Sequence, residues 1–230
     1  MGWLYFDQYY LLLVVPAMII ALIAQINVKS TYSKMSKVRN IRGITGVQAA
    51  QTVLTYYGIT DVTIQRCAGT LSDHYNPRNK TLNLSQGVYD SDSIAAVGIA
   101  CHEVGHAIQH ATGYAPIKIR NFLVPICNIG SSLGLPLAII GYVMGFEPLV
   151  SIGLILYSLI AVFQFITLPV EFNASSRAMA AIEERGLLYD DETGKARKVL
   201  SAAAMTYVAS LIVSLANLLR LVLRFGNRRR

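Results

Sequence analysis

The stretch from Ser93 to Gly113 reads SIAAVGIACHEVGHAIQHATG, an apolar run that carries three ionisable side chains within five residues. Ser93 offers an N-cap oxygen and Gly113 a stop signal, so the stretch predicts one helix of about 20 residues. A helix of that length could also cross a bilayer. The acidic Asp90 and Asp92 just before it and the ionisable groups inside it favour a buried helix of a cytoplasmic domain instead.

The ionisable residues of this stretch form the pattern HExxH, with His102, Glu103 and His106. Residues four apart lie on the same face of a helix, so both imidazoles can bind a single zinc ion. Glu103 can then serve as the general base for a zinc-activated water that attacks a peptide carbonyl. Unrelated helix histidines beside a salt-bridged glutamate are the alternative, but burying such groups without a metal or partner is costly.

The composition indicates a membrane protein. The 230 residues are 53% hydrophobic and only 14% charged, which is too apolar for an ordinary soluble domain. Three segments are long enough to cross a bilayer, at residues 9–28, 122–146 and 148–170, and a fourth candidate is 200–225. We therefore expect a mainly α-helical membrane protein with three or four transmembrane helices.

The charge pattern predicts an orientation. The first ten residues contain no Lys or Arg, whereas five basic residues follow the first span closely. Cytoplasmic loops carry such an excess, so the N-terminus should face outward and residues 29–120 should lie in the cytoplasm, at the plasma membrane. Basic residues beside an anionic leaflet explain the net charge of +7, so the lipid bilayer is an expected partner and nucleic acid is not.

The chain divides into five expected segments: an anchor at 1–28, a catalytic domain at 29–120, a membrane hairpin at 121–170, a returning helix at 171–198, and an apolar helix with a basic tail at 199–230. Within the catalytic domain, a helix is expected at about 46–57, ended by Gly58. Short alternating runs around the turn NPRN then predict a small β-hairpin or three-stranded sheet. We therefore expect residues 29–120 to form a zincin-like α+β domain.

The C-terminal segment has two interpretations. A fourth span would place Arg228, Arg229 and Arg230 outside, against the usual bias. An interfacial helix with Arg220 and Arg224 reaching headgroups is the alternative.

The three cysteines, including Cys101 inside the motif, lack any CxxC spacing. We therefore expect neither a disulfide framework nor a thiolate zinc cage.

A catalytic zinc site needs a third protein ligand and an open position. His110 lies about 12 Å from His102 along the helix and cannot share the ion. Glu171 is favoured, because it stands at the cytoplasmic exit of the predicted hairpin and begins a new helix. The other interpretation of Glu171 is a charge at a helix N-terminus that faces lipid headgroups. Glu183 and Glu184 are weaker candidates for the third ligand, because they lie farther on in a strongly charged stretch.

Other parts of the site are less defined by the sequence. The strand TLNLS, residues 81–85, is a candidate edge strand that could hold a peptide substrate by β-augmentation. A donor near the scissile carbonyl would stabilise the transition state. The sequence does not choose among the candidates, which are His74, Tyr75, Arg177 and Tyr207.

Four blocks, DHYNPRNKTLNLS, SIAAVGIACHEVGHAIQ, LPVEFNASSRA and AAAMTYVA, together resemble the bacterial YugP-like neutral zinc metallopeptidases of the membrane. The resemblance implies a Zn²⁺-dependent enzyme acting on peptides or proteins, membrane proteins among them. A more distant likeness to proteases of the HtpX and CAAX type, whose third ligand is the Glu of an ExxAD block, supports Glu171. Here Ser175 stands in place of the Asp, so Asn173 or Ser175 would have to hold a zinc histidine instead.

These patterns together predict a membrane-embedded zinc endopeptidase. An intramembrane protease of the site-2 type is one alternative, but the LDG block that it would need is missing. A catalytically silent membrane scaffold with structural zinc is the other, and such a site would have no use for Glu103 as a general base.

Overall fold

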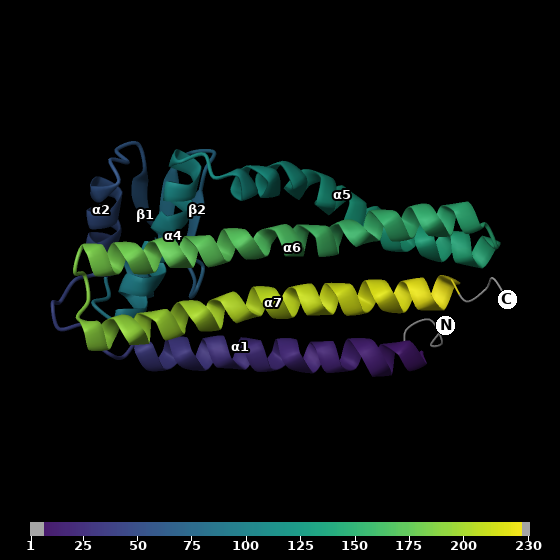
Figure 1. Ribbon diagram of the computed structural model, residues 1–230, viewed down its shortest axis with the longest axis horizontal. Coiled ribbons are helices and arrows are strands. Elements are labelled where there is room, and N and C mark those ends of the chain that lie inside the picture. The colour runs from purple at the N-terminus through teal and green to yellow at the C-terminus, as the bar shows by residue number, and fades with distance from the viewer. Residues whose placement is uncertain (1–6, 227–230) are drawn as a thin grey trace. The chain divides into compact units, whose positions relative to one another are not determined.

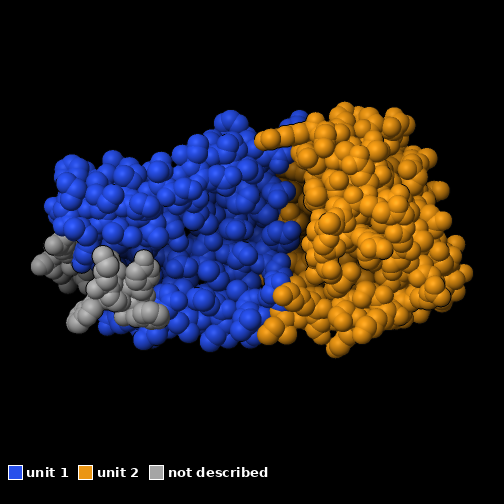
Figure 2. Space-filling model, turned by 180° about the vertical axis from the view of Figure 1, so that it is seen from behind, with its two compact units in different colours: residues 1–25, 118–168, 206–230 blue, residues 26–117, 169–205 orange. Residues whose placement is uncertain are grey.

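The computed structural model describes residues 7–226 and is mainly helical, with one small sheet (Figure 1). The chain forms two compact units, which Figure 2 colours separately. Unit 1 contains residues 1–25, 118–168 and 206–230, and unit 2 contains residues 26–117 and 169–205.

Unit 2 contains two helices, α2 and α4, whose ends follow from the sequence. In α2 (Gly46–Tyr56), Thr45 and Gln48 exchange side-chain and main-chain hydrogen bonds in a capping box, and Gly58 ends the helix with a φ of +66°. In α4 (Ile94–Ala111), the hydroxyl of Ser93 accepts the N–H of Ala96 at 3.1 Å. Both predicted helices are confirmed within about a residue at each end.

The sheet has three strands in the order β1-β3-β2, so the predicted small sheet is confirmed. The strands are β1 (Thr63–Cys67), β2 (His74–Asn76) and β3 (Thr81–Ser85), and the one-turn helix α3 (Gln86–Tyr89) follows. The middle strand β3 pairs with β1 in parallel and with β2 in antiparallel fashion.

The expectation that residues 81–85 form a free edge is therefore wrong. Both sides of β3 are already hydrogen-bonded, so a peptide cannot add to it. Its alternating Leu82 and Leu84 are fully buried, and this pattern marks one buried face without saying how the strands are ordered. The two edge strands are β1 and β2.

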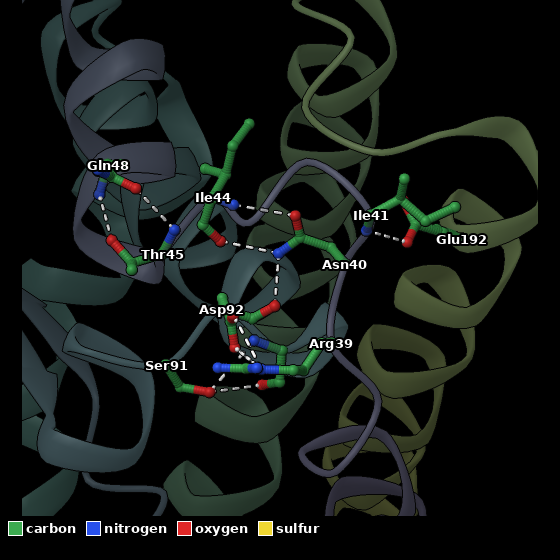
Figure 3. A network of polar contacts seen from close by, with 10 residues as sticks. Arg39, Asn40, Ile41, Ile44, Thr45, Gln48, Ser91, Asp92 and Glu192 are labelled. Atoms are coloured by element: carbon green, nitrogen blue, oxygen red, sulfur yellow. Dashed lines mark hydrogen bonds and ion pairs between the residues drawn. The ribbon is translucent and has the colours of Figure 1, made fainter.

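A loop after α1 (Val15–Met35) ties three parts of unit 2 together (Figure 3). The buried Asn40 donates to the main-chain oxygens of Ile44 and Asp92 and accepts the N–H of Ile44. The next residue, Ile41, donates its N–H at 2.8 Å to Glu192, near the start of α7 (Asp190–Gly226). The loop thereby fixes the N-terminal end of the HExxH helix.

Among the described residues, four helices are long and apolar enough to cross a membrane. They are the first helix at Tyr10–Met35, with its π-helical start η2 (Tyr10–Val14), then α5 (Ala115–Met144), α6 (Glu147–Glu184) and α7. The C-terminal segment is thus one of four such helices, and the HExxH helix is not among them. The basic residues 228–230 lie outside the described part.

The prediction that Glu171 begins a new helix is wrong. One helix, α6, continues from Glu147 through Pro169 to Glu184. A proline removes one main-chain N–H, but helices of membrane proteins accommodate it. The chain turns instead near Gly186, whose φ is +55°, and α7 starts at Asp190 rather than near residue 200.

In unit 1, an ion-pair cluster joins the two ends of the described chain. Asp7 accepts from Arg220 at 3.0 and 3.1 Å and also pairs with Arg224. The guanidinium of Arg220 lies 4.9 Å above the ring of Tyr10. Both arginines therefore pair with Asp7, just before the first helix, and join the two ends of the described residues.

Candidate metal centre

Unit 2 brings His102, His106 and Glu171 together, with one ligand atom of each within 4.8 Å of the others. Glu171 Oε2 lies 3.3 Å from His102 Nε2 and 3.6 Å from His106 Nε2. Ligand atoms bound to one tetrahedral zinc at its usual bond lengths lie about 3.4 Å apart. The three residues are thus spaced and chemically suited to share a zinc ion, with one position left for a water or substrate.

The centre is shielded from solvent. The Glu171 side chain is 3% exposed, and those of His106 and His102 are 11% and 14% exposed. A carboxylate at such depth needs a cation or strong donors nearby, which the two imidazoles or a metal can supply. The centre therefore excludes most water, and its small remaining exposure lies mainly on the two histidines.

The nearby Cys101 takes no part in this set. It is fully buried, and its burial raises the pKa of the thiol to about 12. A protonated thiol is a poor metal ligand, so Cys101 serves as a small apolar residue of the core.

Close contact between α4 and α6 makes the centre possible. A Cβ atom on Gly105 would lie only 2.5 Å from the carbonyl oxygen of Ala174. Only glycine lets the helices approach to this distance, and Ala174 itself is fully buried in the contact. Because Gly105 precedes His106 and Ala174 lies one turn beyond Glu171, this contact sets how far Glu171 reaches toward the histidines.

Glu103 lies beside the ligands without joining them. Its Oε2 accepts the main-chain N–H of Tyr75 at 3.1 Å, so strand β2 holds the carboxylate in place. Burial raises the pKa of Glu103 above its ordinary value, which the positive fields of His102 and His106 only partly oppose. A raised pKa makes this carboxylate a better proton acceptor near neutral pH.

Each histidine is also held at its other ring nitrogen. His102 Nδ1 lies 3.0 Å from the hydroxyl of Ser175, and His106 Nδ1 lies 3.1 Å from Oε1 of Gln109. Gln109 was not predicted as part of the site, although its position three residues after His106 places it on the same helix face. Asn173 contacts Gln109 and Arg177 and acts on the histidines only through Gln109.

The four candidate transition-state donors lie in different places. Tyr75 contacts Glu103 through its main chain, while His74 is exposed, with Nδ1 2.9 Å from the carbonyl oxygen of Ser72. Arg177 donates to Asn173 at 2.8 Å. Tyr207 belongs to unit 1, whereas the metal centre belongs to unit 2. The role of each in stabilising a transition state stays a prediction.

Comparison with known proteins agrees with this geometry. A family model described as "Putative neutral zinc metallopeptidase" matches residues 10–226. The chain belongs to this family. It is 43% identical over 220 residues, covering 96% of the chain and 98% of the relative, to "Putative membrane protease YugP" of Bacillus subtilis (strain 168). No solved structure matches the chain. The predicted resemblance to the YugP-like family is thereby confirmed.

Gly105→Ala should weaken zinc binding by at least tenfold, because the added methyl pushes α4 away from α6 and from Glu171. Gly98→Ala is the matched control on the same helix, since a Cβ there meets Ala196 at an ordinary 3.5 Å. Zinc affinity is measured by competition with a chelator on detergent-purified protein. Equal affinities of the two variants would show that the close helix contact does not set the metal centre.

Proposed function

We propose that the protein is a membrane-embedded zinc endopeptidase whose metal ligands are His102, His106 and Glu171. The observation that carries the proposal is the spacing of their three ligand atoms, which matches that around one tetrahedral ion. The carboxylate of Glu103 lies next to them and is held by the Tyr75 N–H. A general base placed beside, but outside, a ligand set is typical of hydrolysis.

A zinc ion in this site would supply a Lewis acid that makes water more acidic and polarises a peptide carbonyl. Glu103 would accept the proton of the attacking water and later deliver it to the leaving amine. The Tyr75 N–H would hold this carboxylate in place during both transfers. The apolar wall around α4 limits access of bulk water.

The substrate fitted best by these surroundings is an extended peptide segment. Strand β2 is one of the two edge strands of the sheet, and the main-chain N–H of Tyr75 on this strand contacts Glu103. A peptide that pairs with the open side of β2 would therefore lie beside the general base. Unstructured segments of peptides or proteins, including those of membrane proteins, can adopt this extended form.

The alternatives receive less support. An intramembrane protease of the site-2 type would carry HExxH within a span, but α4 is not among the candidate spans of the described chain. A silent scaffold with structural zinc would gain nothing from a carboxylate beside the ligands that the Tyr75 N–H holds and whose pKa burial raises.

For orientation, we propose that the N-terminus faces outward and the metal centre faces the cytoplasm, in the plasma membrane. The basic residues after the first helix support this choice. Four crossings would return the C-terminal end of α7 to the outer side, where Arg220 and Arg224 pair with Asp7. This pairing offsets part of the positive charge that the sequence places there.

Glu103→Gln should lower the rate of cleavage of fluorescein-labelled casein by about 10²- to 10⁴-fold, because the general base is lost. Zinc content, measured by metal analysis, should stay at the wild-type level, since Glu103 is not a ligand. If the zinc-loaded wild type cleaves casein no faster than this variant, the protein is not a peptidase of the proposed kind.

Glu171→Ala should abolish stable zinc binding, because it removes one of three ligands. His110→Ala is the matched control, since His110 is an exposed residue in the last turn of the same HExxH helix. Mass spectrometry of the purified variants for bound zinc distinguishes the two. Zinc retained by Glu171→Ala and lost from His110→Ala would overturn the ligand assignment.

Cysteine labelling tests the orientation in intact cells, in a background with Cys67 replaced by Ser. A cysteine at the exposed Gln51 should react with a membrane-impermeant maleimide only after the membrane is opened. A cysteine at the exposed Glu147, the first residue of α6, should react from outside. The reverse pattern would place the metal centre on the outer side.

A further inference from the structure

Gln109 is a fully buried polar side chain in the contact between α4 and α6. Its Nε2 donates to the main-chain oxygen of Val170 at 2.7 Å and to Oδ1 of Asn173 at 3.0 Å. Its Oε1 lies 3.1 Å from His106 Nδ1. The primary amide thus uses both of its N–H groups and its oxygen within the protein core.

These contacts leave the amide of Gln109 only one orientation. A main-chain carbonyl can only accept, so the NH₂ group must face Val170 and the oxygen must face His106. Asn173 reinforces this choice, because its Oδ1 also accepts the Nε–H of Arg177 at 2.8 Å. If the Gln109 amide were flipped, its oxygen would face the oxygens of Val170 and Asn173, and both of these acceptors would lose their donor.

The fixed amide determines which nitrogen of His106 carries a proton. The oxygen of Gln109 can only accept, so Nδ1 of His106 must be the donor. In the neutral ring the lone pair is then on Nε2, the nitrogen that faces Glu171 at 3.6 Å. This is the tautomer that a metal ion at the shared centre requires.

The same amide also holds the third ligand. Val170 immediately precedes Glu171, and its carbonyl is the acceptor of the shortest Gln109 hydrogen bond. One side chain of α4 therefore fixes the turn of α6 that carries the carboxylate. His102 has no comparable restraint at Nδ1, because the hydroxyl of Ser175 can either donate or accept.

We propose that Gln109 is the positioning residue of the metal centre, which sets the tautomer of His106 and holds Glu171 against it. The proposal rests on the proposed function in taking zinc as the metal. Gln109 itself touches neither substrate nor metal, and acts through the two ligands.

The test replaces Gln109 with Met, which has similar length but cannot donate or accept these hydrogen bonds. Chelator competition on the full-length protein in detergent should show zinc affinity 10- to 100-fold weaker than wild type. Gln51→Met, at an exposed position of α2, is the matched control and should bind zinc as the wild type does. The visible absorption spectrum of the cobalt-loaded Gln109→Met protein should also change, because the ligand geometry changes.

Gln109→Glu provides a second variant with the original size and an oxygen facing His106, but without the NH₂ group. Its zinc affinity should fall between those of the wild type and Gln109→Met. This comparison stands even if the Met variant does not fold. If both Gln109 variants bind zinc as tightly as Gln51→Met, Gln109 has no positioning role, and a lowered melting temperature alone would then indicate packing only.

The same measurements separate this inference from the proposed function. If the wild type itself binds no zinc, or binds it as tightly after His106→Ala, the metal site fails as a whole. If the wild type binds zinc through His106 and the Gln109 variants bind it equally well, only the role of Gln109 is overturned.

Discussion

The approach of α4 to α6 at Gly105 and Ala174 is the constraint on which the metal centre depends. The HExxH motif supplies two ligands from one helix. The third ligand, Glu171, lies on another helix, 65 residues after His106 in the chain. A side chain at residue 105 would separate the helices, since even a methyl group would lie 2.5 Å from a main-chain oxygen. Glycine at position 105 is therefore required for the packing of the two helices rather than for the chemistry of the site.

The polar groups of the centre are compatible with an apolar surrounding because each has a partner. Ser175 and Gln109 hold the outer nitrogens of the two histidines, and the Tyr75 N–H holds Glu103. These partners are neutral, so the only formal charges at the centre come from the two carboxylates and from whatever the histidines or a metal contribute. A divalent cation would balance both carboxylates, which is consistent with the membership of the zinc metallopeptidase family.

Local signals in the sequence were enough to predict α2, α4 and the small sheet of unit 2. Thr45 and Ser93 cap their helices, and Gly58 ends one of them. These effects depend only on residues nearby in the sequence, so they can be predicted without knowing the fold. The HExxH spacing likewise needs only one helix. Glu171 was selected because a membrane hairpin would return it to the side of the motif, and the structure brings it to both histidines.

Other features depend on long-range order and were not accessible from the sequence. The position of β3 between β1 and β2 is set by pairing of distant segments, and its buried leucines fit an edge or a middle strand equally well. The sequence predicts a new helix beginning at Glu171, whereas α6 continues through this residue. The role of Gln109 depends on Val170 and Asn173, which lie far from it in the chain and reach it only after α4 and α6 pack.

X-ray absorption spectroscopy at the zinc edge of the purified protein tests the central claim most directly. The account predicts one zinc per chain bound by two imidazole nitrogens and oxygen ligands at about 2.0–2.2 Å, with no sulfur. Loss of the imidazole signal in a His102→Ala, His106→Ala double variant would assign it to these residues. A zinc ion bound by sulfur, or imidazole scattering that persists in the double variant, would contradict the account.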